Sequence, residues 1–401
     1  MDFSDLSKRL TRTISKTNKQ TEGIYFTSPN TIKHNMDILK KYLKKADTIL
    51  EPSCGSGEYF PQLREMFPTA IITGIEKNKT IYDDVKEFEN ENIKIHNTDY
   101  LTYESPHKYN LIIGNPPYFV MKKTQVDEEY HEYFDGRPNI FILFIIKSLG
   151  LLEKDGILSF VLPYNFLNSL YYDNTRSYIK DDFKILDIIE CMEDEFIDTK
   201  QKTVILLIQN KSGAKNDKFV LDMNGNTILG TKDNIKKMRT LYKNSDTLNN
   251  LGFNVNVGPI TWNQVKDELT RDDTKTQLIY SSDIQNNEFK PKMYSNPMKK
   301  NYIEREGRTS PVLVINRGYG KGKYKFDYCI IDGKKEYLIE NHLMCIRSKV
   351  TVENDILIDK YNKIVESLKN KKTLEFIDLY FRNNAINTTE LNYMVPIYGF
   401  K

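Results

Sequence analysis

Short apolar runs alternate with helical patterns along the first half of the chain. The runs are rich in isoleucine, leucine and valine, and they lie at residues 46–50, 70–75, 93–95, 111–113, 156–163, 185–189 and 203–208. Residues 32–43, 79–88 and 140–152 carry apolar side chains at the spacing of helices packed on a sheet. Because strands and helices alternate, the pattern predicts an α/β fold built on a doubly wound, largely parallel sheet.

The pattern changes in the second half of the chain. Residues around 221–246 are rich in Asn, Lys and Thr and predict a linker, after which short strand-like runs begin at residue 251. Two helical segments, 355–370 and 374–381, follow. We therefore expect an N-terminal domain of residues 1–225, a linker of residues 226–250 and a C-terminal mixed α+β domain of residues 251–401.

Composition narrows the class of protein. Of the 401 residues, 39% are hydrophobic and 28% charged, and no apolar run reaches the roughly 18 residues that a membrane span needs. The polar N-terminus has no apolar signal segment, and the four cysteines are widely spaced. These features predict a cytoplasmic protein with reduced thiols, with no metal site and no membrane contact.

Charge is unevenly distributed. Residues 1–250 carry 34 Lys and Arg against 36 Asp and Glu, whereas residues 251–401 carry 24 against 19. The net charges are thus −2 and +5. The basic excess of the second half suits a polyanionic partner, although a solvated lysine-rich surface gives the same count.

Polar side chains follow four successive predicted strands. They are Glu51, Glu76, Asp99 and Asn115. Ligands of open parallel sheets bind outside the carboxyl ends of the strands, where these side chains are expected to lie. A carboxylate after the second strand suits the hydroxyls of a ribose, and one after the third can accept a hydrogen bond from an adenine amine.

The first of these side chains opens a glycine-rich loop, Glu51-Pro52-Ser53-Cys54-Gly55-Ser56-Gly57. The glycines allow a sharp turn and a close approach to a ligand. No Lys-Ser/Thr pair follows, so the loop is not a phosphate-binding P-loop. The acidic Glu51 would repel a pyrophosphate and favour a cationic amine.

The fourth strand leads into Asn115-Pro116-Pro117-Tyr118. Two prolines fix the backbone and cannot extend a strand ladder, so the turn is stiff. An ordinary strand-ending turn has the same pattern, but a stiff turn is also what holds a reacting group in place.

These pieces, in this order, resemble the γ-class DNA adenine-N6 methyltransferases of type II restriction-modification systems. That family uses S-adenosylmethionine (AdoMet), and the resemblance covers about residues 20–210. It implies an AdoMet-dependent methyltransferase sheet ending in an antiparallel strand, followed by a target-recognition domain. It also implies a cofactor site, and the residues assigned to it are Tyr25, Thr27, Pro29, Glu51, Pro52, Ser53, Cys54, Gly55, Glu76, Asp99 and Asn115.

The resemblance makes Asn115 to Tyr118 the catalytic motif. If the Asn115 side-chain oxygen and the Pro116 carbonyl each accept one N6 hydrogen, the nitrogen lone pair becomes available to attack the methyl group. The target base must leave the duplex. Tyr118 is expected to stack on it, and Phe196, just before the last strand, to stack on its other side, although a core role for Phe196 is also open.

Two segments are candidates for DNA contact. Residues 120–138 are predicted to form a mobile loop that closes over DNA, with Lys122 and Lys123 among its cations. Residues 311–325 predict a strand that leads into a loop of glycines, tyrosines and basic residues. From this second loop we take Asn316, Arg317, Tyr319, Lys321 and Lys323 as candidates for contacts with phosphates and base edges.

Alternative substrates stay open at this stage. The same Asn-Pro-Pro-Tyr chemistry serves enzymes that methylate RNA bases or a protein glutamine amide, and a non-catalytic DNA-binding protein is a further alternative. An N4-cytosine enzyme would more often have Ser in place of Asn115. The 150 strand-rich, basic residues after the sheet favour double-stranded DNA, with a monomer expected and a restriction endonuclease, if there is one, acting separately.

Overall fold

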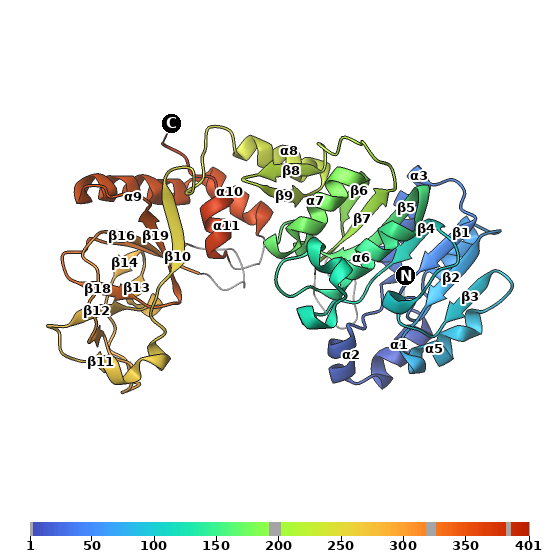
Figure 1. The fold of residues 1–401 in the computed structure, drawn as a ribbon, viewed down its shortest axis with the longest axis horizontal. Coiled ribbons are helices and arrows are strands. Elements are labelled where there is room, and N and C mark those ends of the chain that lie inside the picture. Colours follow the sequence, from blue (N-terminus) through green and yellow to red (C-terminus); the bar gives the residue numbers. More distant parts are fainter. Residues whose placement is uncertain (1–2, 192–201, 318–325, 382–385, 401) are drawn as a thin grey trace. The chain divides into compact units, whose positions relative to one another are not determined.

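The computed structural model describes residues 3–191, 202–317, 326–381 and 386–400. The chain divides into two compact units, residues 1–235 and residues 236–401 (Figure 1). The segment 226–250, expected as a linker, contains strand β9 (Asn226–Leu229) and helix α8 (Lys232–Leu241). The three-part division drawn from the sequence stays a prediction.

A seven-stranded sheet forms the centre of the first unit. In spatial order its strands are β3 (Ile93–His96), β2 (Ile71–Ile75), β1 (Thr48–Glu51), β4 (Tyr109–Gly114), β5 (Leu152–Pro163), β7 (Thr203–Gln209) and β6 (Lys184–Glu190). The first five are parallel, and β7 runs antiparallel to both β5 and β6. This order confirms the predicted α/β sheet and its antiparallel ending.

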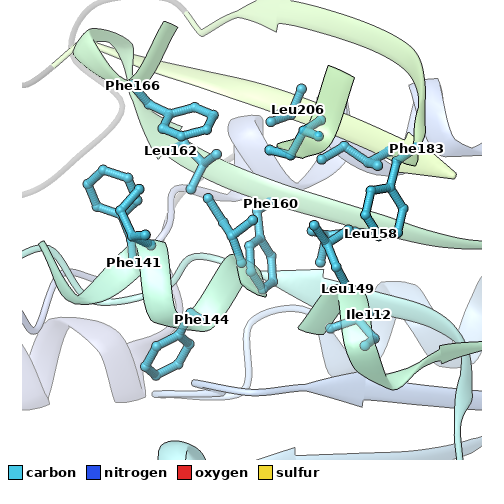
Figure 2. Close-up of a cluster of buried hydrophobic side chains, with 14 of the residues drawn as sticks. Ile112, Phe141, Phe144, Leu149, Leu158, Phe160, Leu162, Phe166, Phe183 and Leu206 are labelled. Atoms are coloured by element: carbon cyan, nitrogen blue, oxygen red, sulfur yellow. The ribbon is translucent and has the colours of Figure 1, made fainter. Parts of the chain in front are cut away.

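Helices cover both faces of this sheet because its strands are apolar on both sides. Neighbouring residues of β4 show this: Ile112 packs into one hydrophobic cluster, and Leu111 and Ile113 pack into the other. One face is covered by α3 (Pro29–Tyr42), α4 (Phe60–Met66) and α5 (Lys79–Val85), and the other by α6 (Ile140–Leu151) and α7 (Asp173–Asp182). Figure 2 shows side chains of α6 beside those of β5.

Helix α6 is apolar over most of its surface, with Lys147 as its one charged residue, and eight of its side chains are buried. Its outer side is covered by Val126, Tyr130 and Phe134, which are buried together with Leu143 of α6. Residues 120–138, predicted to be a mobile loop, are therefore anchored to the core through these three side chains. The mobility of this segment and its closure over DNA stay predictions, whereas the burial of these three residues was not expected from so polar a stretch.

A buried arginine joins the end of this unit to the sheet. Arg176 of α7 is fully buried and donates hydrogen bonds to the carbonyls of Phe166 (3.0 Å), Ser169 (2.6 Å) and Thr227. It also forms an ion pair of 3.0 Å with Asp173. Thr227 belongs to the hairpin of β8 (Val220–Met223) and β9, so this one side chain holds the hairpin against α7.

The polar N-terminal segment forms helices α1 (Asp5–Thr13) and α2 (Lys16–Glu22). Leu10 of α1 is buried with Phe26 and Ile81, and Arg9 pairs with Asp84 at 2.9 Å. The segment is therefore packed on the first unit beside the start of α5.

Beyond α8, the described part of the second unit contains two four-stranded sheets and three α-helices. One sheet has the order β10 (Phe253–Val257), β19 (Leu343–Ser348), β16 (Val312–Asn316) and β17 (Tyr328–Ile331), and the other has β11 (Leu269–Thr270), β15 (Tyr302–Ile303), β12 (Thr276–Ile279) and β18 (Tyr337–Ile339). The helices are α9 (Asn354–Lys369), α10 (Lys371–Tyr380) and α11 (Thr388–Tyr393), and a short hairpin joins β13 (Ile284–Gln285) to β14 (Glu288–Phe289). Among the residues described, no helix is long and apolar enough to cross a membrane.

Candidate functional site

Four neighbouring strands of the first sheet end in polar side chains. Glu51 is the last residue of β1, and Glu76 and Asn115 follow directly after β2 and β4. Asp99 lies three residues beyond β3. Since the four strands are parallel and adjacent, in the order β3-β2-β1-β4, these side chains lie at one edge of the sheet.

The glycine-rich loop after β1 is bound to the end of β2. The Cys54 N–H donates to the carbonyl of Ile75 (2.9 Å), and the Gly55 N–H donates to Oε2 of Glu76 (3.0 Å). Gly55 and Gly57 have φ values of +53° and +73°, which residues other than glycine rarely adopt. The sequence-based expectation of a sharp glycine turn is thus confirmed.

Glu76 is a buried carboxyl with two backbone donors. Its Oε2 accepts from Gly55, and its Oε1 accepts from the Asn78 N–H at 2.6 Å. Burial raises the pKa of Glu76 to about 7, despite the opposing effect of these two hydrogen bonds. The group therefore changes its charge near neutral pH.

Glu51 is buried more deeply, at 2% exposure, and its pKa is raised well above the ordinary value by burial and by the nearby carboxylates of Glu58 and Glu76. Within the described part of the chain, its buried Oε2 atom has no hydrogen-bond partner. A small cavity is lined by Glu51, Tyr25, Thr27, Cys54 and Asn115 among others. An unpartnered buried carboxylate oxygen is costly, and a cationic or hydrogen-donating ligand group would satisfy it.

A larger hollow lies along the same strand ends. Its volume of about 210 Å³ far exceeds the roughly 10–15 Å³ that one water molecule needs, so it has room for an organic ligand. Its wall combines apolar side chains with polar groups at the strand ends. The lining includes Phe26, Pro52, Ser53, Gly55, Ile75, Glu76, Asn78, Ile81, Asp99, Asn115, Pro117, Phe119, Ile140 and Phe144.

Asp99 lines this hollow, but both of its oxygens already have partners. Oδ1 accepts from the Leu101 N–H at 3.0 Å, and Oδ2 is 2.8 Å from Nζ of Lys77. Carboxylate oxygens have further lone pairs, so Asp99 can still accept from a ligand. Its expected contact with an adenine amine stays a prediction.

The chain just before α3 closes the hollow from the other side. Gly23 ends α2 with a φ of +67°, and a Cβ atom there would lie 2.7 Å from the backbone nitrogen of Tyr118. Glycine is therefore required both by the turn and by the close approach. This contact brings the backbone of residues 21–26 against the Asn-Pro-Pro-Tyr turn, and the Tyr25 carbonyl accepts from Nδ2 of Asn115 (3.3 Å).

The Asn115 amide is held in one orientation from both ends. Its Nδ2 donates to the Tyr25 carbonyl, so the amide oxygen Oδ1 is the acceptor at the other end of the group. The Tyr118 hydroxyl lies 2.5 Å from that Oδ1 and 2.7 Å from the Val161 carbonyl. The Tyr118 ring meets Phe141 edge to face at 5.9 Å, so its side chain packs against the core.

Most of the predicted cofactor residues meet in these two cavities. Pro29 is the exception, since it begins α3 behind the Ser28 cap and lines neither cavity. Sequence reasoning missed Lys77, Asn78 and Ile81 at the start of α5. The Asn78 side chain caps that helix, and an asparagine directly before a helical pattern was the available signal.

Only some of the residues predicted to contact the target are among those that the structure describes. Lys122 and Lys123 are exposed, and Asn316 ends β16 with Arg317 exposed beside it. Phe196, Tyr319, Lys321 and Lys323 lie outside the described residues. The roles of all these residues stay predictions.

The chain's known relatives are methyltransferases of restriction-modification systems. Residues 17–197 match the model of the Eco57I restriction-modification methylase family. Type II methyltransferase M.CvrRI of Paramecium bursaria Chlorella virus XZ-6E is 26% identical over 408 residues, and modification methylase CviBIII of Paramecium bursaria Chlorella virus NC1A is 26% identical over 417 residues. Both alignments cover 99% of each protein.

A solved structure is similar over almost the whole chain. The structure of a DrdV–DNA complex covers 95% of this chain and 57% of its own, with a TM-score of 0.55 and 13% identity. The seven-stranded sheet and this likeness show that the chain shares an α/β fold with that structure. The family match and the two full-length alignments show that the chain is similar to type II restriction-modification methyltransferases.

Proposed function

We propose that this protein transfers a methyl group from AdoMet to the N6 amino group of adenine in double-stranded DNA, with the target base turned out of the duplex. The observation that carries the proposal is the Asn115 amide, which lines the strand-end hollow with Glu76 and the smaller cavity with Glu51. The names of the relatives, which are restriction-modification methylases, support DNA as the substrate.

The residues present fit AdoMet. The unpartnered Oε2 of Glu51 suits a cationic group, such as the amino group of the methionine part. Glu76 suits the ribose hydroxyls, which would donate to its carboxylate. The apolar wall that includes Ile81, Phe119 and Phe144 suits the adenine ring. When bound, AdoMet supplies an electrophilic methyl group on a sulfonium.

The chain's own groups would prepare the amine that receives the methyl group. An adenine N6 nitrogen is a poor nucleophile because its lone pair is delocalised into the ring. Oδ1 of Asn115 and the carbonyl of Pro116 would each accept one of its hydrogens, which draws the nitrogen towards a tetrahedral shape and stabilises the positive charge that develops on it. Asn rather than Ser at position 115 favours adenine over the N4 amine of cytosine.

Asn115→Ala tests the mechanism. Loss of one preorganised acceptor is expected to lower the single-turnover rate of methyl transfer to duplex DNA by about 10²–10³. Binding of AdoMet, measured by calorimetry, is expected to persist. Asn30→Ala is a matched control because Asn30 is an exposed asparagine on α3. Turnover of Asn115→Ala at the wild-type rate would refute the assignment.

The substrate is tested separately by long-read sequencing of DNA from a host that expresses the protein. Modified adenines at one short motif are the expected result, and they also name the recognised site. Unmodified DNA, together with label transferred from AdoMet to RNA or to a release-factor-like protein, would replace DNA by one of those substrates. If Tyr118 stacks on the target base, Tyr118→Ala should weaken binding of that base by roughly 1–3 kcal/mol, which is the usual contribution of aromatic stacking.

A further inference from the structure

The second unit contains a lysine-rich segment that was not among the candidates for DNA contact. Residues 290–300, here called the basic loop, contain Lys290, Lys292, Lys299 and Lys300 and no acidic residue. The loop joins β14 to β15 and has no regular secondary structure. Its most unusual member is Met293, whose side chain is 100% exposed.

The loop is anchored through a buried aspartate. Asp283 is 0% exposed, and its Oδ1 accepts both from the Lys292 N–H (2.9 Å) and from the Tyr294 hydroxyl (2.7 Å). The Asp283 carbonyl also accepts from the Lys290 N–H at 2.7 Å. The residues on both sides of Met293 are therefore bound to one fixed point, and the exposure of Met293 is imposed by these anchors.

The other end of the loop is held by an aromatic cage. The Lys299 ammonium lies 4.1 Å from the ring centre of Tyr294, 4.2 Å from that of Tyr280 and 5.7 Å from that of Trp262. These distances are within the range of cation–π attraction. The Tyr280 hydroxyl donates to the carbonyl of Lys300 (2.7 Å), which fixes the next residue as well.

We propose that the basic loop is a DNA-contacting element, in which the lysines near its tip bind backbone phosphates and Met293 enters a groove as an apolar wedge. Lys292 is exposed beside Met293, and Lys290 is exposed and pairs with the Glu288 carboxylate at 2.6 Å. Cationic side chains around a fixed, protruding methionine match duplex DNA, since lysines neutralise phosphates and methionine is among the residues that proteins insert between bases. The carboxylates of an acidic protein could also pair with the lysines, but such a partner has no stacked bases between which Met293 could insert.

The assignment rests on the proposed function, because it takes DNA as the partner. The test measures affinity for a labelled mixed-sequence duplex at several salt concentrations, with the full-length chain. Lys290→Ala with Lys292→Ala is expected to reduce the magnitude of the slope of log K against log salt by roughly 1–2, at about 0.9 per lost phosphate contact. Lys335→Ala is the matched control, as Lys335 is an exposed lysine elsewhere in the same unit.

Met293→Ala is expected to change a different quantity. Because it removes apolar contact and no charge, the duplex should bind about tenfold more weakly, or about 1.4 kcal/mol, with an unchanged salt slope. Val350→Ala serves as its control, since Val350 is also an exposed apolar residue of this unit, at 68% exposure. Both loop variants should keep the wild-type melting temperature because the side chains removed are exposed.

The outcomes separate this proposal from the proposed function. A wild-type protein that binds no duplex and methylates none refutes both. A wild-type protein that binds and methylates DNA, with loop variants of equal affinity and equal salt slope, overturns the loop assignment alone. Lysine-dependent binding of the loop to polyglutamate, with no change in DNA affinity, would overturn it in favour of an acidic protein partner.

Discussion

Glu76 provides the sharpest test of the cofactor site because one substitution should move stability and binding in opposite directions. In the folded protein without ligand, burial raises its pKa from 4.5 to about 7. An unfolded chain would ionise the same group near the ordinary value. Folding therefore takes up a proton between about pH 4.5 and pH 7, and stability falls as the pH rises through this window.

The size of this effect follows from the pKa difference. At 1.36 kcal/mol for each pH unit, the difference between 4.5 and about 7 amounts to about 3 kcal/mol above pH 7. Glu76→Gln removes this cost but loses one of the two backbone hydrogen bonds, which is worth about 1 kcal/mol. The variant should then be more stable than the wild type by about 2 kcal/mol at pH 8, and no more stable near pH 4.

Cofactor affinity should change in the other direction. If the ribose hydroxyls donate to the Glu76 carboxylate, the loss of its charge weakens AdoMet binding by about 10–100-fold, since a hydrogen bond to a charged group contributes about 1.5–3 kcal/mol. Wild-type affinity should also fall below pH 7, by about tenfold per pH unit until the full 10–100-fold loss is reached, while that of Glu76→Gln stays flat. Thermal unfolding at pH 4 and pH 8 and calorimetry with AdoMet measure both. A variant that is less stable at pH 8, or that binds AdoMet as tightly as the wild type, would refute the reasoning.

Three further substitutions test other parts of the structure. Arg176→Leu leaves buried carbonyls without a donor and Asp173 without its partner, so denaturant unfolding should show a loss of about 3–5 kcal/mol. Gly23→Ala must displace the backbone of Tyr118, so the methyl-transfer rate should fall at least tenfold while AdoMet still binds; an unchanged rate would show that the close approach is unimportant. Leu143→Ala should cost about 2–4 kcal/mol and increase hydrogen exchange across residues 120–138, whereas exchange already rapid in the wild type would contradict the packing seen there.

The fold and the centre of the candidate site could be predicted because both depend on local patterns. Apolar runs of strand length ended at Glu51, Glu76, Asp99 and Asn115, and parallel strands place their ends together. The antiparallel ending of the sheet followed from the family resemblance. Neither required knowledge of contacts between distant residues.

What the sequence did not predict depends on such contacts. Val126, Tyr130 and Phe134 recur at every fourth residue among polar ones, but this spacing does not reveal that they pack against α6. The role of Gly23 is likewise set by the backbone of Tyr118, 95 residues later in the chain. The anchoring of the basic loop to Asp283 is equally non-local, because nothing in the run of lysines reveals that its neighbours are fixed.

The hydrogen bond between Tyr118 and Asn115 has a consequence for how a substrate would enter. The tyrosine hydroxyl lies at the amide oxygen that, in the proposed reaction, accepts a hydrogen from the target amine. An arriving amine then replaces a donor already in place, and the displaced hydroxyl keeps the Val161 carbonyl as its acceptor. Substrate binding thus replaces one hydrogen-bond donor by another. Neither the Asn115 oxygen nor the Val161 carbonyl is without a donor before or after the substrate binds.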